Sequence, residues 1–216
     1  MDRFLSSLKE QRWDDHRYYH QSRVNQSLHF VSAVSFLYCY MIVFKDPALA
    51  ALIAWLVSMV TRQSGHFFFE PRGYDAINHA TQDYKEEIKV GYNLHRKRIL
   101  MAIWALSPLL LLVDPTLFGA VKAARSTGEL LHHVGSIWFV VGAGGFLFRI
   151  VQLILTKDAM IAAIWAAKIL TDPFHDIALY YKSPLFLGQK PNPRQFRHDA
   201  DVEEMEEGED APKLAH

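Results

Sequence analysis

The hydrophobic residues of this 216-residue chain are gathered into long blocks that charged or turn-forming segments separate. Four of these blocks are long: 28–44, 48–60, 99–113 and 134–155. The first two are each a little short of the roughly 20 apolar residues that a helix needs to cross a bilayer, and the second continues through Thr61-Arg62 toward His66. The first two are joined only by Lys45-Asp46-Pro47, a strong turn signal, and so form a predicted helical hairpin. The pattern predicts an all-α, polytopic membrane protein with about four transmembrane helices; the alternative is a buried helical hairpin in a soluble protein.

A fifth apolar block, residues 158–170, is too short to span a bilayer. It is predicted to be an interfacial helix, or to pack on the bundle, and to end at Asp172-Pro173. The acidic run at 199–210 is predicted to be disordered, because it has too few apolar residues to form a core. The predicted organisation is an N-terminal segment (1–27), a membrane domain (28–171) that contains a polar loop (62–98), and a C-terminal tail (172–216).

The distribution of basic residues predicts the orientation of the spans. Lysine and arginine concentrate before the first block, between the second and third, and after the fourth, whereas the connectors at 45–47 and 114–131 hold three in total. The positive-inside rule therefore places both termini and the 62–98 loop in the cytoplasm. A formal net charge of zero gives no basis for nucleic-acid binding. A single cysteine, Cys39, excludes an internal disulfide framework.

The chain has eleven histidines, and the predicted topology separates them into two groups. His20 and His29 lie at the cytoplasmic entrance of the first span and His66 at the cytoplasmic exit of the second, whereas the His132-His133 pair falls on the opposite side. His66 and Glu70 share one helical face, at the end of a helix that Pro71 is expected to terminate. Ionisable groups at a membrane helix end are costly unless they have a function, so this pair is interpreted as half of a metal site.

The spacing between His20 and His29 limits how both residues could bind one metal ion. Nine residues separate them, which is half a turn out of phase on an unbroken helix. If both bind one metal ion, the backbone must bend between them, for example at Gln21-Ser22, or His20 must belong to a separate helix or loop.

Two of these segments form a composite motif. Its first half is Tyr19-His20, Asn25 and His29, and its second half is Gly65-His66-Phe67-Phe68-Phe69-Glu70. It resembles the membrane-embedded 2-hydroxy fatty acid dioxygenase family of fatty acid α-oxidation, in which H-x4-N-x3-H precedes the first span and G-H-x3-E ends a later one. The resemblance covers residues 16–78. The chain departs from that family after Glu70, where Pro71-Arg72-Gly73 replaces a basic-Pro-Ala run, and in having fewer hydrophobic segments between the two motif halves.

The resemblance implies an iron(II)-dependent oxidoreductase that takes a 2-hydroxy long-chain fatty acid and O2, at a lipid bilayer, and releases an acid one carbon shorter. The implied ligands of the Fe(2+) cofactor are His20, His29 and His66. Neutral imidazoles, with a carboxylate and open coordination positions, are the usual ligands of non-haem iron(II). Glu70 is either a further ligand or an acceptor that orients an imidazole.

The remaining implied roles concern hydrogen bonding and substrate. Asn25 is expected to provide a hydrogen bond near the ligands, and Arg72 or Arg23 to hold the substrate carboxylate. The acyl chain is expected to pass Phe67, Phe68 and Phe69. Two alternatives stay open: a di-iron membrane hydroxylase or desaturase, which needs about eight histidines on one side, and a non-enzymatic membrane scaffold. The sequence makes no prediction of the oligomeric state.

Overall fold

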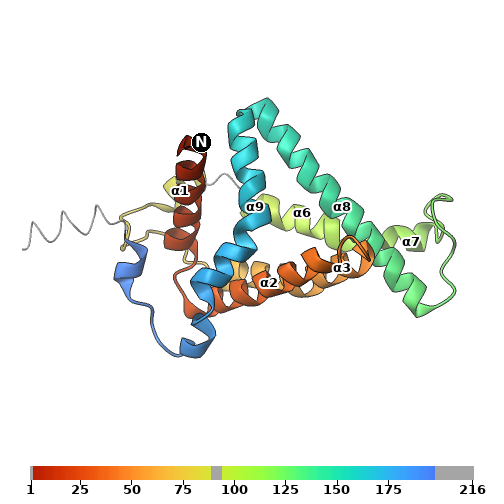
Figure 1. Ribbon diagram of the computed structural model, residues 1–216, viewed down its shortest axis with the longest axis horizontal. Coiled ribbons are helices and arrows are strands. Elements are labelled where there is room, and N and C mark those ends of the chain that lie inside the picture. Colours follow the sequence, from red (N-terminus) through yellow and green to blue (C-terminus); the bar gives the residue numbers. More distant parts are fainter. Residues whose placement is uncertain (1, 89–93, 198–216) are drawn as a thin grey trace, which may run out of the picture.

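The computed structural model describes residues 2–88 and 94–197, and within these ranges the protein is built of helices and contains no strand. Figure 1 shows α8 and α9 meeting at an angle, with α2 and α3 running across the open side of that angle and α1 standing beside α9. The helices are α1 (Asp2–Tyr19), α2 (Arg23–Ile42), α3 (Pro47–Ile53), α4 (Val60–Ser64), α5 (Gln82–Ile88), α6 (Leu94–Leu106), α7 (Leu110–Val113), α8 (Thr127–Thr156) and α9 (Ala159–Tyr180). The all-α prediction is confirmed for the described residues.

α3 and α4 belong to one longer helical segment, residues 47–69. The π-helical stretch Ala54–Met59 joins α3 to α4, and a second π-helical stretch, Gly65–Phe69, follows α4. The segment ends at Phe69 because Glu70 is extended and Pro71 follows it, as the sequence predicts. Wide π turns are rare and frequently occur at functional sites.

The helix starts follow from local capping chemistry. Four helices begin after a serine or aspartate whose side chain accepts a hydrogen bond from a main-chain N–H three residues later, the usual N-cap arrangement. These caps are Ser22, Asp46, Ser126 and Asp158. Pro47 also occupies the first turn of α3, where its missing N–H has no helical partner to lose. The caps explain why the connections between α1 and α2, between α2 and α3, and between α8 and α9 are short.

The apolar core lies away from the ionisable groups described below. Trp55, Trp104 and Trp138 pack together, with ring centroids 4.7 Å apart for Trp55 and Trp104 and 5.7 Å apart for Trp55 and Trp138. The Trp104 indole N–H donates to the main-chain carbonyl of Trp138 at 2.9 Å. This cluster holds the 47–69 segment against α6 and α8.

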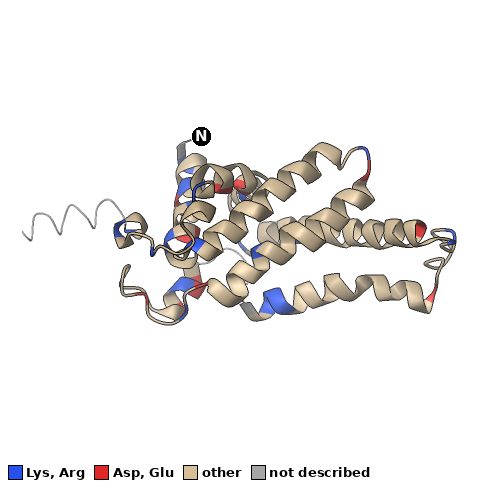
Figure 2. Ribbon diagram, turned by 90° about the horizontal axis from the view of Figure 1, so that it is seen from below, with Lys and Arg blue, Asp and Glu red and all other residues tan. Residues whose placement is uncertain are grey.

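Two helical segments are long and apolar enough to cross a membrane, Pro47–Phe69 and Thr127–Thr156. The most apolar window of α8 is 17% buried, so most of its apolar surface faces outward. Figure 2 shows that the positions of Lys, Arg, Asp and Glu lie mainly toward the end of the molecule that contains α1 and at the loops of the opposite end. The first predicted span lies largely in α2, and the third is divided by a 3-10 turn at Ser107–Leu109 between α6 and α7. By length and composition, the structure thus supports two of the four predicted spans.

The prediction that Asp172-Pro173 ends the fifth helix is wrong. α9 is 22 residues long and continues through Pro173 to Tyr180. Proline removes one main-chain hydrogen bond, but the aspartates on either side, Asp172 and Asp176, are buried and ion-paired to α1 and α4, which holds the helix in place. Residues 172–180 are therefore part of the helical bundle rather than of the predicted tail.

Two further boundaries can be compared with the sequence predictions. α8 begins at Thr127, seven residues before the predicted start at 134, so that His132 and His133 lie inside a helix. Helix α5 covers Gln82–Ile88, within the segment 62–98 that was predicted to be a polar loop. The predicted disordered run at 199–210 lies outside the described residues.

Candidate metal centre

His20 lies at the corner between α1 and α2. α1 ends at Tyr19 and α2 begins at Arg23, so the predicted bend at Gln21-Ser22 is confirmed. Two side-chain amides from the first turn of α2 secure this corner: Asn25 Nδ2 donates to the carbonyl of Tyr19 at 2.7 Å, and Gln26 Nε2 donates to the carbonyl of His20 at 2.8 Å. These bonds satisfy main-chain carbonyls that the end of α1 leaves without helical partners. Asn25 thus acts on the backbone beside His20.

His29 and His66 come from the two helices that face this corner. His29 lies on α2 with no exposed surface, and His66 lies in the π-helical stretch after α4. The two helices approach closely at Gly65, where a Cβ atom would stand 2.2 Å from Asn25 Oδ1 and 3.3 Å from His29 Cδ2. The glycine is therefore needed for the close packing that brings His66 beside His29.

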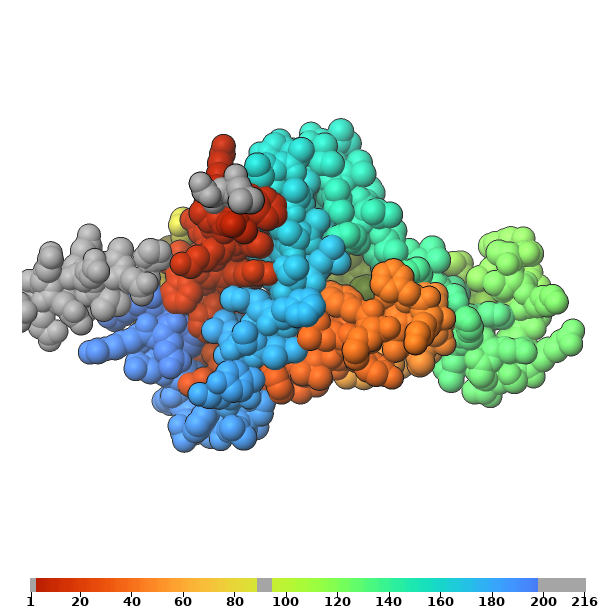
Figure 3. Space-filling view, in the orientation of Figure 1, coloured from red at the N-terminus to blue at the C-terminus, as the bar shows by residue number. Residues whose placement is uncertain are grey.

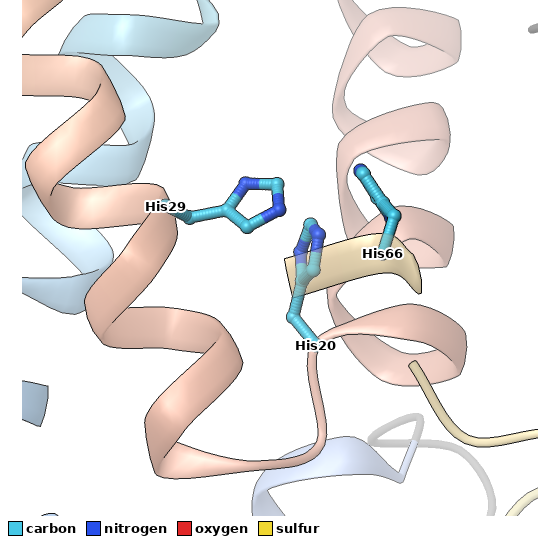
Figure 4. Close-up of side chains that lie close together, drawn as sticks. All are labelled: His20, His29 and His66. Atoms are coloured by element: carbon cyan, nitrogen blue, oxygen red, sulfur yellow. The ribbon is translucent and has the colours of Figure 1, made fainter. Parts of the chain in front are cut away.

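The three histidine rings converge, as Figure 4 shows. Their centroids are 4.0 Å apart for His20 and His29, 4.9 Å for His29 and His66, and 5.5 Å for His20 and His66. One ring nitrogen from each lies within 4.8 Å of the others, and all three side chains are buried. Of the described residues, only these three form such a buried group of metal-ligating side chains.

The histidines carry unpaired nitrogens. Nε2 of His20 and both ring nitrogens of His29 are buried without a hydrogen-bond partner. An unsatisfied buried polar atom costs about 1–3 kcal/mol of stability, and here several point toward one place. A metal ion would use these lone pairs, so the residues present fit a metal ion at this place.

In each of the three histidines, Nδ1 lies near an oxygen atom of another side chain. The distances from Nδ1 are 2.7 Å to Glu70 Oε2 for His66, 2.9 Å to the Tyr180 hydroxyl for His20, and 3.6 Å to Asp176 Oδ2 for His29. Metal-bound histidines generally donate their second N–H to such an oxygen, which fixes the tautomer and orients the ring. Nδ1 of His66 and Nδ1 of His20 bond protein oxygens, whereas Nδ1 of His29 lies beside Asp176 at a distance beyond a hydrogen bond; the Nε2 atoms would then be the ones available to a metal ion. Of the two roles expected for Glu70, this contact is that of the acceptor that orients an imidazole.

Buried ion pairs extend from this site along α9. Asp176 receives a 2.9 Å hydrogen bond from Arg62, and Asp172 bonds Lys168 at 2.7 Å and Arg12 at 3.2 Å. Lys168 also pairs with Asp15 of α1. Carboxylates and cations are therefore paired, which offsets much of the cost of burying them.

Polar residues of α9 border the histidine group and were not predicted from the sequence. Lys168, Asp172, Asp176 and Tyr180 recur every four residues and so share one helical face. That spacing is visible in the sequence, but it crosses Pro173, where the helix was expected to end.

The electrostatic environment favours neutral histidine. Burial lowers the pKa of His20 well below its usual range, and the neighbouring His29 lowers it further. Neutral imidazole offers the lone pair that binds a metal ion. At neutral pH His20 is therefore in the form that can act as a ligand.

Arg72 and Phe68, two of the residues predicted to contact the substrate, lie at the surface, whereas Phe67 is half-buried next to His66. Arg72 is exposed and donates to the main-chain carbonyl of Phe67 at 2.8 Å, which closes the end of the helical segment. Arg23 donates to Gln26 Oε1 at 3.1 Å. Phe68 is 76% exposed and faces outward. In this structure the two arginines bond neighbouring parts of the chain, and Phe68 does not line the histidine site.

The fold and the site define an all-helical protein with a three-histidine candidate metal centre at the junction of α1, α2 and the 47–69 segment. Comparison of the chain with protein-family models, with curated proteins and with solved structures finds no match to any of them. The site itself therefore carries the functional argument.

Glu70→Gln tests whether Glu70 orients His66 or binds the metal directly. Because a neutral amide weakens the charge-assisted bond to Nδ1, we expect cobalt(II) affinity to fall about 10- to 100-fold, measured by competition with a chelator. Glu87→Gln, at an exposed position on α5, is the matched control and should bind like the wild type. A loss above about 1,000-fold would indicate a direct ligand, and an unchanged affinity would remove Glu70 from the site.

Proposed function

We propose that this protein is an iron(II)-dependent membrane dioxygenase that shortens 2-hydroxy long-chain fatty acids by one carbon. The observation that carries the proposal is the buried group His20, His29 and His66, in which one ring nitrogen of each lies within 4.8 Å of the others and Nε2 of His20 and of His29 has no protein partner. The composite motif in which these residues stand, and its resemblance to the 2-hydroxy fatty acid dioxygenases, supply the substrate class.

The proposed reaction needs no additional reductant. A 2-hydroxy acid, RCH(OH)COOH, and O2 give RCOOH, CO2 and H2O. The bond between the carboxyl carbon and the hydroxyl-bearing carbon breaks, these two carbons together lose four electrons, and O2 accepts all four. This balance distinguishes the reaction from a hydroxylation or desaturation, in which two of the four electrons come from an external donor.

The residues of the chain would hold and orient the cofactor. His20, His29 and His66 would bind iron(II) through Nε2, while Tyr180, Asp176 and Glu70 face the opposite ring nitrogens. The bound iron would supply the site at which the hydroxy acid chelates and O2 is activated. Three protein ligands leave open positions on a metal that accepts six, which a substrate chelating through carboxylate and hydroxyl oxygens requires.

The proposed membrane placement agrees with the position of the site. We propose a multi-pass topology with both termini in the cytoplasm and four spans, of which 47–69 and α8 are the most apolar. The histidine group lies at the end of the 47–69 segment, near the corner of α1 and α2, whereas His132 and His133 lie near the start of α8, at the other end of the fold (Figure 1). A long-chain acid dissolved in the bilayer would thus present its polar end at the histidine group.

The test is an assay of the purified full-length protein with iron(II), O2 and a 2-hydroxy long-chain fatty acid. Mass spectrometry is expected to show the acid one carbon shorter, with one O2 consumed per product and no added reductant. The unhydroxylated acid of equal length is the control and should not react.

Each other result would contradict the proposal in a different way. Absence of product with iron bound would reject the reaction. Two irons per chain would favour the di-iron alternative. Metal content that stays unchanged on replacement of the three histidines would favour a non-enzymatic scaffold.

A further inference from the structure

We propose that Tyr180 and His16 are positioning residues that fix the tautomer of His20 and link the metal centre to the C-terminal segment, residues 181–197. The inference rests on the proposed metal centre and adds to it a chain of hydrogen bonds that the composite motif does not contain. In order, the chain is His20, Tyr180, His16 and the main chain of Gln195.

The Tyr180 hydroxyl lies between two histidines. It is 2.9 Å from Nδ1 of His20 and 3.0 Å from Nδ1 of His16. All three side chains are buried, so bulk water does not compete for these contacts. The main chain of Gln195 lies beside His16, where its carbonyl could accept a hydrogen bond from the ring.

Counting donors fixes the direction of every bond in the chain. A hydroxyl group has one hydrogen to donate and can accept a second bond, and neutral imidazole has one N–H and one lone pair. If Nε2 of His20 is to bind a metal ion, the proton of His20 must be on Nδ1, which then donates to the Tyr180 oxygen. Tyr180 donates in turn to Nδ1 of His16, and the remaining N–H of His16 donates to the carbonyl of Gln195.

The opposite direction would prevent metal binding. If Tyr180 donated to Nδ1 of His20, the proton of that ring would be on Nε2, and the lone pair for the metal would be lost. His16 prevents this arrangement because its unprotonated Nδ1 receives the only hydrogen of the hydroxyl group. Tyr180 and His16 thus hold His20 in the tautomer that a ligand requires.

Residues 181–197 pack against His16 and also help to hold the backbone of His20. Phe196 is buried, and its ring lies 5.2 Å from that of His16. Ser183 donates to Gln26 Oε1 at 2.8 Å, and Gln26 in turn holds the carbonyl of His20. Figure 3 shows this segment, in darker blue, packed against the end of α1 and the start of α2, in agreement with the contacts between these elements. The segment is therefore linked to His20 indirectly, to its ring through His16 and Tyr180 and to its main-chain carbonyl through Gln26.

The experiment measures cobalt(II) and iron(II) binding to the full-length protein carrying Tyr180→Phe. Tyr181→Phe is the matched control, since the neighbouring tyrosine is 53% exposed. We expect Tyr180→Phe to weaken metal binding about 10- to 100-fold. We also expect it to shift the visible absorption of the cobalt form, a change that a role in folding alone would not produce. Tyr181→Phe should match the wild type in both measurements.

Two variants of His16 test the direction of the chain independently. Asparagine can place an accepting oxygen near the position of Nδ1, so His16→Asn should retain most of the affinity. His16→Phe has no acceptor and should lose as much as Tyr180→Phe. These variants decide the matter if Tyr180→Phe does not fold.

The outcomes separate this inference from the proposed function. Wild-type affinity and cobalt spectrum in Tyr180→Phe, or equal losses in His16→Asn and His16→Phe, would overturn the inference. A wild-type protein that binds metal but does not shorten the hydroxy acid would overturn the proposed reaction while the binding measurements still test the chain of hydrogen bonds. A wild-type protein that binds no metal would overturn both.

Discussion

His29→Ala is expected to lower the affinity for iron(II) or cobalt(II) by more than 100-fold, because it removes a ligand itself, whereas loss of a residue that orients a ligand costs about 10- to 100-fold. His29 is fully buried, and neither of its ring nitrogens has a hydrogen-bond partner in the protein. A metal ion would supply a partner for one of these nitrogens. Among the three histidines, His29 has the strongest reason to act as a ligand rather than as a packing residue.

Stability provides a second measure of the same variant. A ligand present at 100 times its dissociation constant stabilises the folded protein by about 2.7 kcal/mol. We expect the wild type to show such a metal-dependent rise in melting temperature and His29→Ala to show none. The metal-free variant should lose little stability, because the cavity it creates is offset by the removal of two unsatisfied polar atoms.

His132→Ala is the matched control for this measurement. His132 is exposed near the start of α8, and the structure places it outside the histidine group. Metal-dependent stabilisation should be retained in this variant. Equal stabilisation of His29→Ala and the wild type would contradict the assignment of His29 as a ligand.

The three histidines of the site were expected from the composite motif and its resemblance, and local signals in the sequence account for two features that bring them together. The phase difference between His20 and His29 required a bend, and the structure has one, capped by Ser22. Pro71, five residues after His66, marks the end of the 47–69 segment. Local rules of capping and helix termination are sufficient for such features.

The residues of α9 that contact the histidines could not be predicted in the same way. Tyr180 and Asp176 reach the histidines only because α9 continues past Pro173, and ion pairs with Arg12 and Arg62, far away in the sequence, help to hold it there. Tertiary contacts of this kind override the local preference of proline to end a helix. His16 likewise has a role only through Tyr180.

The number of membrane spans predicted from the sequence is larger than the number of helical segments long and apolar enough to span a membrane. Apolar composition alone predicts four blocks, but a span also requires one unbroken helix of sufficient length. The block at 99–113 is divided by a 3-10 turn at Pro108, whereas 134–155 is part of a 30-residue helix. The position of a proline within an apolar block is therefore as informative as the hydropathy of the block for predicting a membrane-spanning helix.

Gly65→Ala is expected to destabilise the protein and to weaken metal binding together. The backbone of Gly65 is helical, so alanine would by itself favour the helix by about 1 kcal/mol. Its Cβ atom, however, would stand 2.2 Å from Oδ1 of Asn25, a fully buried side chain that holds the carbonyl of Tyr19. Overpacking of this kind costs about 1–3 kcal/mol, and the broken hydrogen bond adds about 1 kcal/mol, so destabilisation outweighs the helical preference.

A double-mutant cycle with Asn25→Ala identifies the cause. Asn25→Ala alone loses the bond to Tyr19 but removes the atom that the new methyl group would meet. We therefore expect Asn25→Ala/Gly65→Ala to be no less stable than Asn25→Ala, a non-additive result measured by chemical denaturation. Gly144→Ala is the control for the glycine substitution, since a Cβ there meets nothing within 4 Å, and it should be neutral or slightly stabilising. Additive losses of stability in the cycle would show that Gly65 is not required for the close approach of α2 to the 47–69 segment. The position of His66 beside His29 would then need a different explanation.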